Sequence, residues 1–129
     1  MLHRHPLIWI LSLATIVACS SSTDSSAPIP GLQVKVQNIS FASTHNPTTN
    51  PAVDTIAVGD TVSWVWTNTG STPHSIESDP ATVTDPSFTS SASKTGNGKV
   101  YTIVFTAAGD YEYDCGIHGN AMTGEIVVQ

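Results

Sequence analysis

The sequence predicts an all-β fold, a sandwich or barrel of antiparallel strands in a single domain, and three observations support this prediction. Several short runs alternate apolar with polar residues, which is the spacing that places side chains on one face of a strand. Turn residues such as Gly59–Asp60 and Gly109–Asp110 separate these runs. No stretch shows the period of an amphipathic helix, and about six to eight short strands in roughly 100 residues are typical of a sandwich.

The first predicted strand region changes its alternation partway. Val34 and Val36 share one parity, whereas Ile39 and Phe41 share the other. An extra residue in one strand of a pair produces a switch of this kind. We therefore expect a β-bulge around Gln37–Asn38.

The later strands each present one apolar face toward the core. Their ranges and inward residues are 60–68 with Val62, Trp64 and Trp66; 99–106 with Tyr101, Ile103 and Phe105; 110–115 with Tyr111, Tyr113 and Cys115; and 124–128 with Ile126 and Val128. Glu112 and Asp114 alternate with the tyrosines and are expected to face away from the core. Residues 43–51 and the polar stretch 78–98 are expected to form loops.

The chain of 129 residues divides into three parts. Residues 1–18 carry one firm positive charge, Arg4, before the apolar run Leu7–Val17. This run is too short to span a membrane and fits a secretory signal peptide. Residues 19–31 are rich in serine and proline, a composition typical of a tether, and residues 32–129 suffice for one globular domain.

The string Ile16–Cys19 resembles the lipobox of bacterial lipoproteins. The resemblance implies that cleavage exposes Cys19, whose sulfur then carries a lipid; a plain signal peptide cleaved near Ala18 is the alternative. An acylated protein lies on a membrane without spanning it. We therefore expect an exported, lipid-anchored protein that faces the periplasm. A serine directly after the cysteine, as at Ser20, resembles the pattern of outer-membrane lipoproteins, so the outer membrane is favoured over the inner.

The part of the chain that follows the signal peptide is strongly acidic. Without Arg4, three lysines remain against ten aspartates and glutamates, which gives a formal charge of −7. This charge argues against binding to nucleic acid and against docking on anionic lipid. It suits a protein partner with a positively charged face.

Cys115 gives the first indication of function. The sequence holds two cysteines, and a pair in an oxidising compartment is normally read as a disulfide. If Cys19 is acylated, Cys115 is an unpaired thiol in a place where such thiols are oxidised. Burial as a small apolar residue would protect the thiol, and so would permanent ligation to a metal.

Three further residues offer metal-binding atoms in a suitable setting. The stretch YDCGIHGNAM adds His118 and Met122 to Cys115, and TPHSIES places His74 in a strand context. His45 lies in a polar loop and is expected to be exposed. Two imidazoles, one thiolate and a weak axial thioether form the donor set of a mononuclear electron-transfer copper site. Zinc would take four stronger ligands, and iron–sulfur clusters need more cysteines.

Each of these residues also has a simpler role by itself. Cys115 alone would be an inert buried thiol, Met122 a core filler, and His74 an ordinary histidine near the end of a sheet. Their joint presence and spacing favour the copper site.

Two stretches, VGDTVSWVWTNTGSTPHSIES and YTIVFTAAGDYEYDCGIHGNAMTGEIVV, resemble the plastocyanin/azurin family of cupredoxins over about residues 32–129. The resemblance implies a Greek-key β-sandwich with a type 1 copper site. Three residues separate His118 from Met122, one fewer than in plastocyanin and one more than in amicyanin-like members. Ser75 stands where plastocyanin often has an asparagine that ties the two ligand segments together, and its hydroxyl is expected to make that bond more weakly.

The resemblance also implies a function. We expect a one-electron carrier with one copper per chain, which cycles between Cu(I) and Cu(II) on His74, Cys115, His118 and Met122. We expect it to be a monomer and no enzyme, because this donor set leaves no open position for a substrate. Its partner would be a redox protein such as a cytochrome or a copper enzyme, with a basic docking face. The alternatives are a periplasmic copper carrier or store, and a metal-free sandwich for adhesion or assembly.

Overall fold

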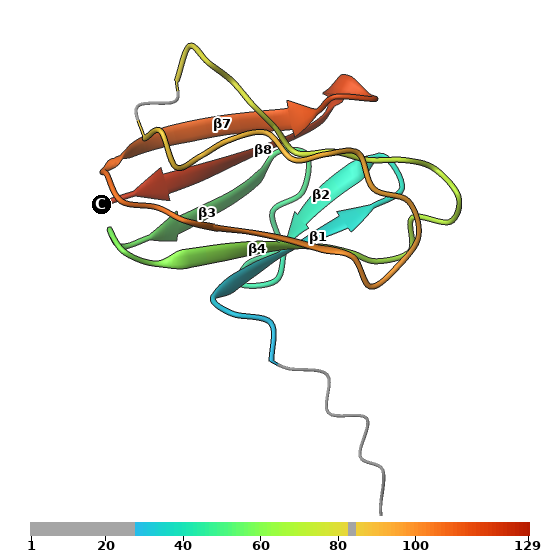
Figure 1. Ribbon diagram of the computed structural model, residues 1–129, viewed down its shortest axis with the longest axis horizontal. Helices are drawn as coiled ribbons and strands as arrows, with labels where there is room; N and C mark the ends of the chain where they lie inside the picture. Colours follow the sequence, from blue (N-terminus) through green and yellow to red (C-terminus); the bar gives the residue numbers. More distant parts are fainter. Residues whose placement is uncertain (1–27, 83–84) are drawn as a thin grey trace, which may run out of the picture.

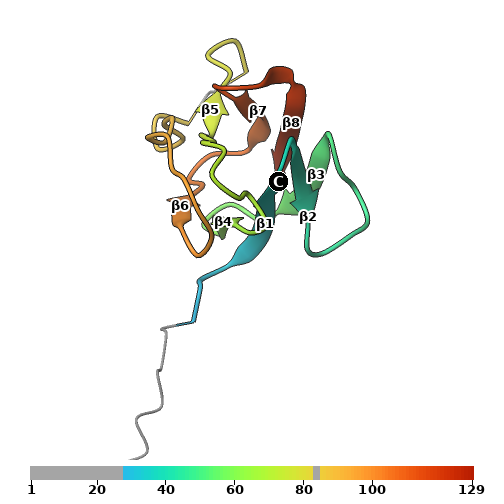
Figure 2. The ribbon, with the colours of Figure 1, turned by 90° about the vertical axis from the view of Figure 1, so that its right-hand side faces the viewer.

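A computed structural model describes residues 28–82 and 85–129 of the chain (Figure 1). Two four-stranded sheets pack face to face (Figure 2), with the strand order β2-β1-β4-β6 in one and β3-β8-β7-β5 in the other. The strands are β1 (Leu32–Gln37), β2 (Ser40–Ser43), β3 (Ala52–Ile56), β4 (Thr61–Trp66), β5 (Glu77–Ser78), β6 (Val100–Val104), β7 (Gly109–Cys115) and β8 (Gly119–Val128). The predicted all-β sandwich is confirmed.

Pairing within the sheets is mixed, whereas the sequence predicts antiparallel pairs throughout. β1 runs parallel to β4 and β3 runs parallel to β8; the other pairs are antiparallel. After β1 and β2 the chain crosses to the second sheet for β3 and then returns for β4. A crossover brings the chain back in its original direction, which a short hairpin cannot do.

The predicted signal peptide, Cys19 and the tether as far as residue 27 lie outside the described residues. Residues 28–82 and 85–129 include no helix that is long and apolar enough to cross a membrane. β1 begins at Leu32, the first residue of the predicted globular domain.

The core lies between the sheets and is built from the faces that alternation predicts. Every predicted inward residue is buried except Tyr101, which is partly buried and reaches Thr89 with its hydroxyl. Trp64 stacks on Phe88 with ring centroids 5.8 Å apart and meets Tyr113 edge-on at 5.3 Å. Trp64 of β4 thus contacts Tyr113 of β7, the strand that carries Cys115, so this aromatic cluster joins the two sheets.

The expected bulge around Gln37–Asn38 is wrong, because the chain turns there into a hairpin. Gln37 pairs with Ser40 across β1 and β2, so Asn38 and Ile39 form the turn. The change of parity reflects the start of a new strand. Ile39 adopts a left-handed conformation with φ of 56°, which is rare for a β-branched residue.

Asp85 fixes the long loop between β5 and β6. Its buried carboxylate accepts hydrogen bonds from the amides of Ser87 at 2.9 Å and Ala107 at 3.0 Å, and from the amide and hydroxyl of Thr106. Burial by itself would raise the pKa of Asp85, but the hydrogen bonds from Ser87 and Thr106 outweigh burial and hold the pKa well below its usual range. The carboxylate thus ties the loop to the turn between β6 and β7.

Candidate metal centre

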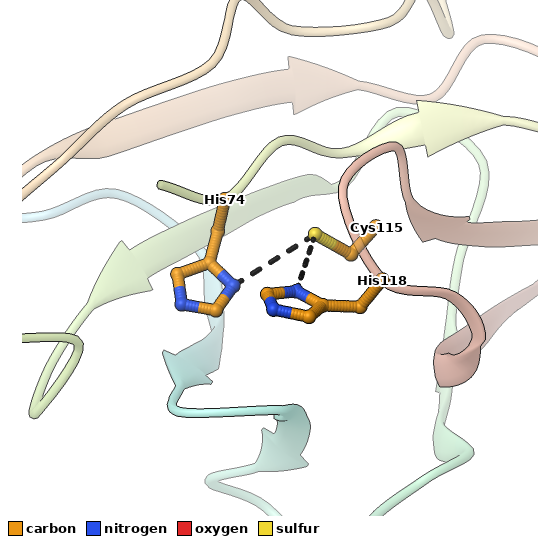
Figure 3. Close-up of side chains that lie close together, drawn as sticks. All are labelled: His74, Cys115 and His118. Atoms are coloured by element: carbon orange, nitrogen blue, oxygen red, sulfur yellow. Dashed lines mark hydrogen bonds between the residues drawn. The ribbon is translucent and has the colours of Figure 1, made fainter. Parts of the chain in front are cut away.

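Three of the four predicted ligand side chains lie together where β7 ends. The donor atoms of His74, Cys115 and His118 are all within 4.8 Å of one another. Figure 3 shows the three side chains pointing toward a common point, with the Cys115 Sγ 3.4 Å from Nδ1 of His118 and 3.8 Å from Nδ1 of His74. The planes of the two imidazoles are tilted by 33°, with centroids 4.9 Å apart.

Cys115 is placed by the alternation of β7. It shares the inner face with Tyr111 and Tyr113 and is fully buried, whereas Glu112 is exposed and Asp114 is half-buried. Within the described part of the chain the thiol forms no disulfide. An unpaired, buried sulfur therefore faces two imidazole nitrogens.

His74 is held through its backbone. Its amide donates to the carbonyl of Lys94 at 3.0 Å, and the amide of Lys94 donates back at 2.8 Å. Burial, and then the nearby His118, lower the pKa of His74, which favours the neutral imidazole that binds metals. Its Nδ1 faces the cluster, 3.8 Å from the Cys115 Sγ, and its Nε2 is buried without a hydrogen-bond partner among the described residues.

A tight loop brings His118 back toward Cys115. The amide of His118 donates to the carbonyl of Cys115 at 3.0 Å, and the amide of Ala121 donates to the carbonyl of His118 at 3.3 Å. Gly119 closes the turn with φ of 54°, a conformation that glycine adopts without strain. His118 is only half-buried, so its imidazole connects the cluster with the protein surface.

Met122, the fourth predicted ligand, lies in β8, the strand that leads out of this loop. Its side chain is fully buried. His45, in contrast, is exposed in the loop between β2 and β3, as predicted.

The bond expected from Ser75 is present. The amide of Gly116 donates to the Ser75 hydroxyl oxygen at 3.1 Å, and Ser75 itself is buried. A side chain at Gly116 would lie within 2.5 Å of a Glu77 carboxylate oxygen and 2.8 Å of the Ser75 hydroxyl. The absence of a side chain there lets the two ligand segments approach closely.

The sequence does not reveal the role of Lys94. Its contact with His74 uses only backbone atoms, and the two residues lie 20 positions apart in the sequence. No side-chain pattern reports a contact of this kind, because every residue type except proline offers the same amide and carbonyl.

The residues present fit a copper ion. A thiolate and imidazole nitrogens are the donors that copper prefers, and no carboxylate belongs to the cluster.

Residues 37–129 match a family described as copper binding proteins of the plastocyanin/azurin family. The chain is 38% identical over 84 residues to the chloroplastic plastocyanin of Tetradesmus obliquus, an alignment that covers 61% of this chain and 57% of that protein. The match thus spans little more than half of that relative.

Solved structures show the same fold. A purple cupredoxin from Nitrosopumilus maritimus superposes with a TM-score of 0.56 at 26% identity, over 76% of this chain and 99% of that one. A copper-containing nitrite reductase from Thermus scotoductus gives 0.59 at 26% identity, over 80% of this chain but only 23% of the reductase. Amicyanin from Paracoccus versutus gives 0.53 at 22% identity, over 81% and 86% of the two chains, and so shows likeness of fold alone. Since the family match extends from the end of β1 to the last residue, the chain belongs to the plastocyanin/azurin family of copper-binding proteins.

Proposed function

We propose that this protein is a one-electron carrier whose single copper ion is held by His74, Cys115, His118 and Met122. One observation carries the proposal: the buried, unpaired sulfur of Cys115 faces Nδ1 of one imidazole at 3.4 Å and Nδ1 of a second at 3.8 Å. A thiolate suits Cu(I) and imidazoles suit Cu(II), so such a set can hold both oxidation states.

Fast electron transfer requires a site that changes little when the metal changes its charge. The chain supplies this rigidity by fixing the backbone of both ligand segments. Lys94 pairs with His74 in both directions, and Ser75 holds Gly116 beside Cys115. Attachments of this kind fix the orientation of metal ligands.

We propose electron transfer in preference to catalysis. Four protein donors would leave no open position for a substrate or a reactive water molecule. The likeness to nitrite reductase covers only 23% of that enzyme's chain. A binuclear copper site would need a second cysteine near Cys115, and residues 28–82 and 85–129 contain no other cysteine.

A copper carrier or store is the second candidate. Such a protein needs exposed ligands that exchange their metal readily. Cys115 and His74 are fully buried and His118 is half-buried, which favours a permanently bound ion.

The test is to add one equivalent of Cu(II) to the protein and to record a visible spectrum and a voltammogram. We expect an intense thiolate-to-copper band, a reversible one-electron wave and slow exchange of the metal. Copper binding without the band or the wave would favour the carrier or store. Failure to bind copper would favour a metal-free sandwich.

We propose further that the protein is exported and anchored by a lipid on Cys19, facing the periplasm. The support is the sequence of residues 16–20, together with an acidic, lysine-poor chain that would not adhere to anionic lipid by charge. The tether would then leave the domain free to meet a partner near the membrane.

The proposed partner is a redox protein with a basic face, such as a cytochrome or a copper enzyme. A groove on the side of β7 and β8 is lined by several carboxylates, which are Glu77, Asp79, Glu112, Asp114 and Glu125. Burial raises the pKa of Asp114, and the neighbouring negative charges of Glu77 and Asp79 raise it further. A positively charged partner would be attracted to this side of the molecule.

A further inference from the structure

We infer that Asn50 is a positioning residue for the metal loop: its side-chain amide fixes the backbone at Ala121 and thereby the place of Met122. The inference rests on the proposed function, because Met122 is the proposed axial ligand of the copper ion.

The segment that carries Met122 leaves the regular pairing of β8. The register with β7 jumps from the pair Cys115–Gly119 to the pair Asp114–Thr123, so residues 120–122 bulge out between these pairs. Pairing of β8 with β3 begins only after the bulge. Met122 is nevertheless fully buried, so contacts other than the two strand ladders must place it.

Asn50 reaches the bulge from the loop between β2 and β3. Its Nδ2 donates to the carbonyl oxygen of Ala121 at 3.0 Å and to the carbonyl oxygen of Ile39 at 2.8 Å. Its Oδ1 accepts from the amide of Phe41 at 3.2 Å. An asparagine amide has two N–H donors and one carbonyl oxygen, and here each of them is used.

Holding the carbonyl of Ala121 restricts its neighbour. This carbonyl belongs to the peptide unit that leads into Met122, and the peptide unit is planar. The amide of Ala121 is bonded within the loop, to the carbonyl of His118 at 3.3 Å. Asn50 adds an attachment from outside the loop, on a residue 71 positions away in the sequence.

Asparagine is well suited to this position. Asn50 has φ of 43°, a left-handed conformation that asparagine tolerates better than most residues. Glycine would keep the backbone and lose all three side-chain bonds. Aspartate would keep the acceptor for Phe41 but would set an oxygen against the two carbonyl groups.

Asn46 is the matched control in the same loop. Its Nδ2 donates to the carbonyl of Val53 at 2.9 Å and its Oδ1 accepts from the amide of Thr48 at 2.9 Å. These bonds stay within the loop and its neighbouring strand. Asn46→Ala should therefore lower the thermal stability without affecting the metal loop.

The experiment uses the full chain loaded with one equivalent of Cu(II). In Asn50→Gly we expect copper loss to a chelator to become about fivefold faster, the factor that corresponds to one hydrogen bond of about 1 kcal/mol. The ratio of the two main visible bands and the reduction potential should shift as well, because both depend on the axial ligand. Asn50→Asp should shift them further, and Asn46→Ala should leave all three unchanged.

Two results would overturn the inference. The first is that both Asn50 variants lose thermal stability as Asn46→Ala does, yet keep the wild-type band ratio, potential and rate of copper loss; Asn50 would then only close its own loop. The second is an unmoved NMR signal of the Met122 methyl group in the metal-free protein. We expect this signal to move in both Asn50 variants and not in Asn46→Ala. An unmoved signal contradicts the inference even if the wild-type protein fails to show a copper band, which would refute the proposed function by itself.

Discussion

At the residue scale, the properties of the metal centre depend on the sulfur of Cys115. The visible band of a thiolate–copper bond needs this atom, so Cys115→Ser should abolish the colour of the copper-loaded protein. His45→Ala is the control, because His45 is exposed and takes no part in the cluster. The measurement is a visible spectrum at one equivalent of copper. A Cys115→Ser protein that stayed strongly coloured would show that another residue binds the metal.

A second prediction at this scale concerns Asp85. Asp85→Asn would turn N–H groups toward the amides of Ala107 and Thr106, so we expect a loss of about 2–4 kcal/mol in the free energy of unfolding at pH 7. Because the folded pKa is lowered, the stability from the ionised carboxylate is complete above the unfolded pKa of about 3.9 and is lost as the pH falls toward the folded value. Urea unfolding at pH 7 and pH 3 should show the difference between wild type and variant shrinking at the lower pH.

Asp60 provides the control for Asp85. It is exposed and accepts one bond from the amide of Ala57 at 3.0 Å, so Asp60→Asn should cost less than about 1 kcal/mol. Equal losses in the two variants would contradict the special role of the buried carboxylate.

The sequence predicts the orientation of some single residues but not the hydrogen-bonding roles of others. The inward direction of Cys115 follows from local alternation, which depends only on its neighbours in the strand. The roles of Asp85 and Asn50 depend on partners 21 and 71 positions away. Both lie in loops, where no periodicity indicates which backbone group a side chain reaches.

At the scale of the elements, the hairpin between β1 and β2 carries backbone strain. Ile39 holds φ of 56° while 48% exposed, so its side chain gains little from burial. Asn tolerates this conformation, and Ile39→Asn should raise the free energy of unfolding by about 1 kcal/mol. Urea unfolding measures the change, with the dependence on urea expected to stay constant.

Val58→Asn is the matched control for the hairpin. Val58 is 49% exposed and is not among the described residues with positive φ. The same change of side chain should therefore bring no gain at Val58. An equal gain at both positions would mean that the effect comes from removing exposed apolar surface.

Among the strands, the sequence predicts which face of a strand is buried but not which strands pair. Period-two alternation predicts the inner faces of β4, β6, β7 and β8, because burial acts on each strand separately. It does not predict the parallel pairs of β1 with β4 and β3 with β8, because pairing depends on where the chain crosses between sheets. The parity switch predicts a bulge where the chain forms the hairpin at Asn38 and Ile39. Asn38 is a common turn residue, but the β-branched Ile39 holds the positive φ that glycine or asparagine usually takes, so the pair does not match a tight-turn signal.

At the scale of the whole molecule, the proposed anchor predicts a membrane-bound protein. The full chain should partition into detergent and incorporate radioactive palmitate, because a lipid on Cys19 would hold it at the membrane. Cys19→Ala should abolish the labelling while leaving the copper spectrum unchanged. Unlabelled protein found free in the periplasm would favour an ordinary signal peptide cleaved near Ala18.

The last prediction concerns the route of the electron out of the molecule. His118 is half-buried, whereas His74 is fully buried, so the edge of His118 is the expected port. Ile117 beside it is 51% exposed, and an uncharged rim lets a partner approach closely at little cost in desolvation. Ile117→Lys should therefore slow electron transfer to a basic cytochrome and leave the visible spectrum nearly intact.

Two further variants separate contact from attraction at a distance. Val104→Lys adds the same charge at a residue that is 48% exposed and pairs with Thr61, at the opposite end of β4 from the His74 segment, so it should leave the contact at His118 intact. Glu112→Gln should mainly weaken the salt dependence of association, because charge steering is screened over about 10 Å at 0.1 M salt. Stopped-flow measurements with the cytochrome and with a small inorganic oxidant, over a range of salt, distinguish these effects. If Ile117→Lys slows the cytochrome no more than Val104→Lys does, the electron leaves through another surface.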